Sequence, residues 1–587
     1  MHSKNKFAPT KLAWVCAVLT ASMSPMAHAV KFEMDNGITG SFDSTLSFGM
    51  QKRLKSPNTR MIGNDSGGTG ATSGALGSLV NGDASTANPD INFTNSDDGN
   101  LNYRKGSVVS SVVKGTHELS LREQGNWSML GRFTWSSDLS ARKTIRTPLD
   151  DEAANVLKKD ITLLDFWVAK ELDLGGNSAK LKLGNQVISW GEDIFILGGI
   201  NSVNALDLRK FHIPGTQLKE IFIPAPMASL STSLGKGFST EAYYQFAWNG
   251  MKLDPAGTFW STADFVGAGG KRGGYFPSSP PYGAIGGLGD FDPTRGRDMA
   301  SVAAGHVPIE TQKPQKGGQY GISLRYKPAA SDSEFAGYYM RYHDKLPFIG
   351  YKSNGLGTPN AIGLSGLEQY GENLDLFGVS MNTKMGDWAF GAEFSYRPKD
   401  SVAIDPTVPF SGKHSLYEKS NGFTSAAVSN GYVSEKKYQL QATAFRFLPT
   451  ELTRTLGAAE GYVMAEVAYT LYPHLDLSGA VPYYITDYSL PTKRSWGYVA
   501  EIGLSYANFM NSGWTMNPVL DFFHDVRGTS PNAIPFVEGR KALALALNFD
   551  YQNKVKASIG YTTFFGGGTQ NLMSDRDVMS LTMSYSF

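Results

Sequence analysis

Apolar and polar residues alternate along much of the chain. Near its end, Met579, Leu581, Met583, Tyr585 and Phe587 share one face, and three serines and a threonine fall between them. A period of two residues is that of a β-strand, whose successive side chains point to opposite faces. The same pattern returns throughout the sequence, so we predict an all-β fold.

About 18 stretches carry this pattern. The predicted strands lie near residues 38–50, 107–123, 126–138, 161–172, 179–187, 226–234, 238–249, 318–327, 334–343, 374–385, 387–397, 435–448, 461–472, 496–508, 513–525, 541–551, 554–565 and 577–587. Bacterial membrane barrels generally have even strand numbers. We therefore expect one transmembrane antiparallel β-barrel of about 16–18 strands.

Alternation by itself also fits a soluble β-sandwich, so other features must decide. Aromatic residues near strand ends, such as Trp388 and Tyr396, are typical of the two aromatic girdles of a barrel. Only 18% of the residues are charged, against about 25% in soluble proteins. Arginine facing lipid costs about 2–4 kcal/mol at the bilayer midplane, so strand charges should face the lumen. The predicted lumen-lining residues are Arg132, Arg325, Glu393, Arg397, Glu501 and Asp521.

Several connections between the predicted strands are long and rich in Gly, Pro, Ser and Asn. We expect extracellular loops at residues 51–106, 250–317, 344–373 and 398–434. Short periplasmic turns are expected near Gly386–Asp387 and Asn553.

Residues 188–225 lack sustained alternation but hold apolar runs such as Ile221-Phe222-Ile223. We hypothesise an infolded element that occludes part of the lumen, and the alternative is an ordinary surface loop with a helical turn. The polar contacts of the infolded element would come from Trp190, Glu192, Asn201, Asn204, Asp207, Arg209 and Glu220.

Residues 1–29 have the pattern of a secretory signal peptide. Lys4, Lys6 and Lys11 precede a short apolar core, and Ala27-His28-Ala29 is typical of a cleavage site after Ala29. The mature chain, residues 30–587, would hold 51 basic and 53 acidic residues and no cysteine. This composition excludes disulfides and argues against general nucleic-acid binding. We expect a barrel in the outer membrane, in contact with its lipids.

Several motifs resemble the outer-membrane family catalogued as domain of unknown function 1302, with a likeness from about residue 30 to the C-terminus. The motifs are Phe42–Ser47, Asp98–Tyr103, Gly184–Glu192, Gly199–Asn201, Pro214–Gly215 and Leu218–Glu220. The resemblance implies an exported barrel, often encoded beside a periplasmic lipid-carrier-like protein and an inner-membrane exporter of the resistance-nodulation-division type. It also implies a lipid, sterol or other hydrophobic cargo, and it identifies no catalytic residue.

The leading functional prediction is a channel or transport component of the outer membrane, without a metal or cofactor. The first alternative is a surface receptor or adhesion scaffold with a sealed barrel. The second is an outer-membrane hydrolase, which needs Ser, His and an acidic or Asn group at one rim. The sequence contains no H-E-x-x-H, G-x-S-x-G or P-loop motif. Tyr585 and Phe587 resemble the C-terminal signal that barrel-assembly machinery reads.

Overall fold

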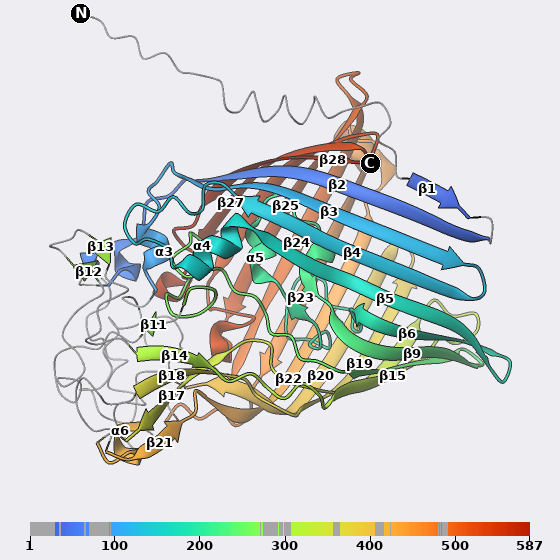
Figure 1. Ribbon diagram of the computed structural model, residues 1–587. Helices are drawn as coiled ribbons and strands as arrows, with labels where there is room; N and C mark the ends of the chain where they lie inside the picture. Colours follow the sequence, from blue (N-terminus) through green and yellow to red (C-terminus); the bar gives the residue numbers. More distant parts are fainter. Residues whose placement is uncertain are drawn as a thin grey trace, which may run out of the picture.

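Eighteen strands pair in chain order to form a closed antiparallel barrel in the computed structural model (Figure 1). The predicted fold class is therefore confirmed, and the strand number is the higher end of the predicted range of 16–18. The structure describes residues 30–34, 37–63, 66–69, 93, 96–270, 272–273, 291–292, 297–298, 307–355, 364–404, 416–422, 424–478, 481, 483 and 491–587. The predicted signal peptide, residues 1–29, lies outside this part of the chain.

Each barrel strand coincides with one of the predicted stretches, with ends shifted by a few residues. The strands are β2 (Ile38–Arg53), β3 (Val108–Glu123), β4 (Trp127–Asp138), β5 (Asp160–Leu174), β6 (Asn177–Gln186), β9 (Ala225–Gly235), β10 (Phe238–Gln245), β15 (Gln319–Tyr326), β16 (Glu334–Tyr342), β19 (Leu374–Met385), β20 (Trp388–Ala403), β22 (Tyr432–Phe447), β23 (Glu460–Leu471), β24 (Arg494–Phe509), β25 (Trp514–Arg527), β26 (Lys541–Tyr551), β27 (Val555–Phe565) and β28 (Val578–Ser586). A further short strand, β1 (Val30–Glu33), pairs with the start of β2.

The barrel closes where the last strand meets the first. Strand β28 pairs with β2 from Thr45 opposite Ser586 to Arg53 opposite Val578. The final residue continues the ladder, because Phe587 N donates to Ser44 O at 2.8 Å and Ser44 N donates to Phe587 O at 2.7 Å. The sheet therefore has no free edge, as a sheet in hydrocarbon requires.

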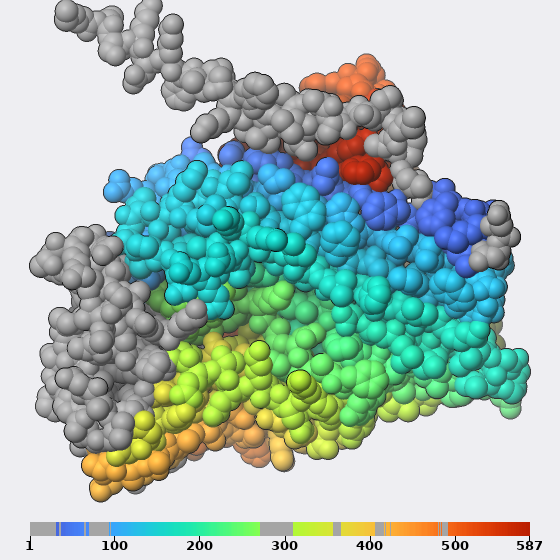
Figure 2. Space-filling view, viewed as in Figure 1, coloured from blue at the N-terminus to red at the C-terminus, as the bar shows by residue number. Residues whose placement is uncertain are grey.

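The two faces of the wall are the reverse of those in a soluble protein. Large apolar side chains such as Leu440 and Leu581 are exposed, whereas Gln441 and Glu466 are each about 1% exposed. Figure 2 shows the wall strands on the near side, coloured blue to green, as a continuous outer surface. An apolar exterior with a polar interior is what a bilayer selects. Within the described ranges, no helix is both long and apolar enough to cross a membrane.

Connections at one end of the barrel are short and those at the other end are long. At the turn end, two to twelve residues connect one barrel strand to the next, and the longest of these connections contains α7 (Thr450–Thr455). The loop end carries α3 (Asp98–Leu101), α4 (Asp151–Lys158), α6 (Leu416–Lys419), η1 (Thr59–Met61), η6 (Pro531–Ala533) and η7 (Gly568–Gln570). This alternation matches the predicted placement of loops and turns.

The loop end also carries small sheets that sequence analysis did not predict. One sheet has the order β11 (Arg272–Gly273), β14 (Val307–Thr311), β18 (Leu364–Gln369), β17 (Phe348–Asn354) and β21 (Ala426–Ser429). A second is the pair β12 (Phe291–Asp292) and β13 (Arg297–Asp298). These strands fall inside three of the predicted loops, so those loops are partly ordered.

The predicted loop at 398–434 is shorter than expected, because β20 continues to Ala403 and β22 begins at Tyr432. The prediction ended the strand before Pro398, which cannot donate to a ladder. The register between β20 and β22 shifts between Arg397 and Asp400, so Pro398 sits in a bulge and pairing resumes after it.

Adjacent residues of a wall strand face lipid and lumen in turn, so two neighbouring residues of β28 should differ in how well they tolerate a charge. Leu581 is 38% exposed on the outer face, and Ser580 points inward. We expect Leu581→Arg to lower the free energy of unfolding in lipid by about 2–4 kcal/mol if it lies near the bilayer midplane, because a guanidinium then faces hydrocarbon. Ser580→Arg is the matched control and should cost far less. Denaturant titration of protein folded into liposomes measures both, and an equal cost would contradict the assigned faces.

Candidate functional site

The 38 residues between β6 and β9 leave the loop end of the wall and turn into the lumen. We call residues 187–224 the lumen segment. It contains β7 (Ala205–Leu206), α5 (Leu208–His212), η3 (Leu218–Glu220) and β8 (Phe222–Ile223). Antiparallel pairing of β7 with β8 joins the middle of the lumen segment to its end. The infolded element predicted from the loss of alternation is thus present in the barrel.

Two wall carboxylates hold the first half of the lumen segment by its backbone. Glu466 on β23 accepts N–H groups from Ile194, Phe195 and Ile196 at 3.3, 2.5 and 3.1 Å. Glu393 on β20 accepts from Glu192 N and from the N–H of residue 200, at 2.6 and 2.8 Å. Irregular backbone inside a barrel needs such partners, and a carboxylate is a strong acceptor.

Close approach of the segment to β20 depends on Gly199. A Cβ at Gly199 would lie 2.0 Å from Glu393 Oε1 and 2.1 Å from Gln441 Oε1. Arg397, further along β20, donates to Gly199 O at 2.7 Å and to Ser202 Oγ at 2.6 Å. A side chain at this position would therefore displace the Glu393 carboxylate and the Gln441 amide that contact the segment.

The second half of the segment is fixed on the other side of the barrel. Lys114 of β3 lies 2.8 Å from Glu220, and both side chains are nearly fully buried. Thr116 also donates to Glu220, at 3.1 Å. Strand β3 lies half way around the barrel from β20. The segment therefore crosses the lumen from wall to wall.

Between these attachments the segment forms an apolar core with the wall. Trp190 is 1% exposed, and its ring contacts Tyr243 at 5.2 Å and Tyr338 at 5.6 Å between centroids. Its Nε1 donates to Glu241 at 2.7 Å. The same cluster includes Met340 and other inward residues of β16 and β19. In this sector the inner wall is apolar, contrary to the expectation of a polar lumen face, because the lumen segment covers it.

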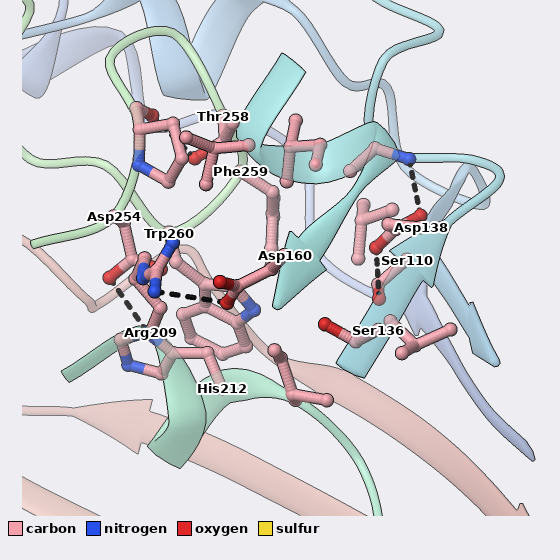
Figure 3. Close-up of a pocket in the computed structure, with 17 residues that line it drawn as sticks. Ser110, Ser136, Asp138, Asp160, Arg209, His212, Asp254, Thr258, Phe259 and Trp260 are labelled. Carbon is pink, nitrogen blue, oxygen red and sulfur yellow. Dashed lines mark hydrogen bonds and ion pairs between the residues drawn. The ribbon is translucent and has the colours of Figure 1, made fainter. Parts of the chain in front are cut away.

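Helix α5 carries an ion-pair network at the loop end of the segment. Arg209 lies 2.6 Å from Asp207 and 3.1 Å from Asp160 of β5. His212 lies 2.8 Å from Asp254 and stacks on Trp260 with ring centroids 4.4 Å apart. Figure 3 shows Asp160, Arg209, His212, Asp254 and Trp260 around a small pocket of about 60 Å³. Contacts to β5 and to the 254–260 loop fill this corner of the lumen.

A larger cavity of about 500 Å³ lies between the lumen segment and the loops above it. Its walls are mainly apolar and include Leu206, Met251, Phe265, Leu346, Phe348 and Ile534. One part is charged, with Arg397, Lys437 and Asp400 from the wall and Asp344 and Lys345 from the 343–373 connection. Burial, together with the nearby Asp400 carboxylate, raises the pKa of the Asp344 carboxyl to about 7. Burial also lowers the pKa of Lys345 to about 7.

One sector of the lumen is largely uncovered by the segment, which approaches it where Gly215 lies beside Thr582 of β28. The inward residues of β26, β27 and β28 are mostly small, and most are intermediate in exposure. We call this set the small-residue sector, and it comprises Ala544, Ala546, Asn548, Ser558, Gly560, Thr562, Ser580, Thr582 and Ser584. Inward residues of β20, β22 and β23 such as Glu393, Gln441 and Glu466 are in contrast almost fully buried. The free space of the lumen therefore lies along β26–β28.

Two residues predicted to line the lumen stand beside this sector. Glu501 of β24 and Asp521 of β25 are cross-strand partners. Tyr462 donates its hydroxyl to Glu501 at 2.5 Å. Both carboxylates face inward, on strands adjoining the small-residue sector.

The four other predicted lumen-lining residues also point inward but are engaged in contacts. Glu393 and Arg397 hold the lumen segment, as described above. Arg132 lies 2.7 Å from Glu118 and 2.6 Å from Asp165. Arg325 lies 3.1 Å from Glu334. These charges are mostly compensated by wall or segment groups.

The seven predicted polar residues of the segment divide into two groups. Those with a partner outside the segment are Trp190, Glu192, Asp207, Arg209 and Glu220. Asn201 and Asn204 instead stabilise the segment's own turn, because Asn204 Nδ2 donates to Asn201 Oδ1 at 2.8 Å and to Ile188 O at 2.6 Å. Sequence reasoning missed the wall partners Lys114, Glu241, Gln441 and Glu466. Alternation places all four on inward faces, which was the available signal.

No group of three or more His, Cys, Asp or Glu among the described residues is placed to hold a metal ion. Tyr585 and Phe587 lie on the outer face of the closing strand and stack with ring centroids 5.7 Å apart.

An edge-free barrel with an apolar exterior and a partly filled polar lumen defines an outer-membrane β-barrel protein. The chain belongs to the family described as "Protein of unknown function (DUF1302)", whose sequence model matches residues 10–587. No curated protein matches the chain.

Among solved structures, the chain is similar to three outer-membrane proteins of low identity. Pseudomonas aeruginosa OccK5 (OpdH) is 10% identical, with 93% of this chain and 98% of that chain covered and a TM-score of 0.37. Acinetobacter baumannii OccAB1 is 9% identical, with 96% and 99% covered and a TM-score of 0.41. Salmonella typhi OmpF, in complex with daunomycin, is 7% identical, with 95% and 100% covered and a TM-score of 0.34. The fold described above stands on the strand pairing, independently of these scores.

Proposed function

We propose that the protein is an outer-membrane channel whose passage runs between the lumen segment and the small-residue sector. The observation that carries the proposal is the contrast between the two sides of the lumen. Inward residues of β20, β22 and β23 are buried under the segment, whereas those of β26–β28 are small and partly exposed. A barrel of this strand number is wide enough for an aqueous passage when only part of it is filled.

The long connections would face the outside of the cell and the short ones the periplasm. The two carboxylates Glu501 and Asp521 would adjoin the passage, while arginines on the filled side are compensated. Charges of both signs around one lumen favour weak ion selectivity.

A hydrophobic or lipid-like cargo is the second part of the proposal. It is supported by the apolar walls of the 500 Å³ cavity above the lumen segment. The family resemblance supports partnership with a periplasmic lipid carrier and an inner-membrane exporter. The C-terminal aromatics Tyr585 and Phe587 support insertion by the barrel-assembly machinery.

Narrowing the small-residue sector tests the passage directly. Ala546 points inward on β26, and Leu545 beside it is 42% exposed on the outer face. We expect Ala546→Trp to lower single-channel conductance in planar bilayers several-fold, because the indole enters the passage. Leu545→Trp adds the same group to the lipid side and should leave the conductance unchanged.

Equal conductance of the two variants and the wild type would contradict the proposed route. A wild-type barrel that passes no current, and no solute in a liposome-swelling assay, would instead support the sealed scaffold.

A further inference from the structure

The large cavity contains a buried cation, Lys437, that forms no direct ion pair among the described residues. Lys437 of β22 is 6% exposed and lines the cavity. Its Nζ forms no hydrogen bond or direct ion pair among the described residues and lies 5.8 Å from the centroid of the Tyr472 ring. Asp400 and Asp344 attract it from a longer distance. A buried ammonium without a direct ion pair is costly, so a ligand that supplies one is stabilised there.

The neighbouring charges are already engaged with each other. Arg397 donates to Tyr342, to Ser202 and to a backbone carbonyl of the lumen segment, and lies 3.8 Å from Asp400. Asp400 accepts the Tyr472 hydroxyl at 2.7 Å. Asp400 is thus held by Arg397 and Tyr472 and forms no direct ion pair with Lys437.

The loop side of the cavity contributes one basic and one acidic side chain, Lys345 and Asp344. Lys345 donates to Gln319 at 2.8 Å and follows Asp344 directly in sequence. Asp344 accepts the Gly371 N–H at 3.2 Å. Among the five charged side chains that line the cavity, three are basic and two are acidic. The cavity as a whole therefore favours a negative ligand group over a positive one.

The rest of the lining is suited to a hydrocarbon chain. Leu206 lies on the lumen segment, and Met251, Leu346, Phe348 and Ile534 come from the loops. The volume of about 500 Å³ falls within the range of about 300–1,000 Å³ that is usual for small-molecule sites. An apolar chamber with more basic than acidic side chains in its lining is complementary to a molecule that is apolar at one end and anionic at the other.

We infer that this cavity binds single-chain anionic amphiphiles, with the acidic head group on Lys437 and the chain against the apolar walls. This inference deepens the proposed function and rests on it for the route by which the ligand arrives. Binding itself is measured without transport.

The experiment uses the full mature barrel in nanodiscs of zwitterionic lipid, with empty nanodiscs subtracted. The probes are tritiated decanoate, decanol and decyltrimethylammonium, which share one chain length and differ in head-group charge. We expect decanoate to bind saturably and at least tenfold more tightly than either of the other two. Lys437→Gln should remove this preference, and Lys437→Arg should retain it.

The matched control is Lys384→Gln, which removes an exposed lysine at the turn end and should leave decanoate binding unchanged. Heat modifiability on electrophoresis shows whether each variant has folded. The probe series on the wild type stands even if Lys437→Gln does not fold. Equal wild-type binding of all three probes, or tight decanoate binding by folded Lys437→Gln, would overturn the inference.

The outcomes separate the site from the channel. Decanoate binding to a barrel that carries no current supports the site and contradicts the channel. Current through a wild-type barrel that does not bind decanoate supports the channel and contradicts the site.

Discussion

Deletion of residues 192–222 is expected to raise single-channel conductance several-fold. This stretch carries the backbone held by Glu393 and Glu466 and the side chain of Glu220 held by Lys114, so its loss clears the lumen. Gln186 pairs directly with Ala225, so the remaining residues need only bridge adjacent strands. Planar-bilayer recording of the refolded, heat-modifiable protein measures the change.

The double variant Glu393→Gln with Glu466→Gln is the milder companion to this deletion. It keeps every residue of the lumen segment but replaces charged acceptors by neutral ones, which are weaker. We expect a noisier current with a mean near that of the wild type. An unchanged current in the deletion variant would show that the lumen segment does not restrict the passage.

Breaking the buried ion pair between Lys114 and Glu220 has the largest expected effect on stability. Lys114→Met leaves the Glu220 carboxylate buried with only the Thr116 hydroxyl beside it. We expect the free energy of unfolding to fall by about 3–5 kcal/mol. Denaturant titration in liposomes gives the value, and limited proteolysis should show earlier cleavage within the lumen segment.

Two further variants separate the cost of an unpaired charge from the loss of packing. Adding Glu220→Leu to Lys114→Met removes the second charge and should restore most of the stability. The exposed pair of Lys352 with Glu310 is the surface comparison, where Lys352→Met should cost about 0–1 kcal/mol. A loss that the double variant does not recover would contradict the electrostatic explanation.

The barrel could be predicted because the alternation that defines each strand is visible within that strand's own sequence. Alternation places every second residue on one face, and a strand such as Lys541–Tyr551 shows this without reference to its neighbours. Infolding of the lumen segment was visible as the place where alternation stops while apolar content stays high. Strand β20 shows the limit of this reasoning, because a bulge at Pro398 let it continue past the expected end.

The contacts inside the barrel were not predictable in the same way. Alternation shows that Glu466 faces inward, but its partners, the backbone N–H groups of residues 194–196, are about 270 positions away in the chain. Such pairing depends on how the segment folds across the lumen. The inward apolar residues Tyr338 and Met340 were also missed, since the polar-lumen rule assumes water where Trp190 lies.

The unpaired Lys437 was missed for a related reason. The predicted strand near 435–448 contains Glu435, Lys436 and Lys437, and alternation alone does not show which charge finds a partner. That depends on Arg397 and Asp400 of β20 and on Tyr472 at the start of the connection after β23.

The closure of β28 on β2 constrains the order in which the protein can form. Thr45 bonds Ser586 across a separation of 541 residues, so the two edges can meet only after the whole chain has been synthesised. Contacts between such distant residues form slowly, because a very long loop must close first. Until then the first and last strands present unpaired backbone that is prone to aggregation. The two strands that close the barrel are therefore the part of the wall that stays open to aggregation longest.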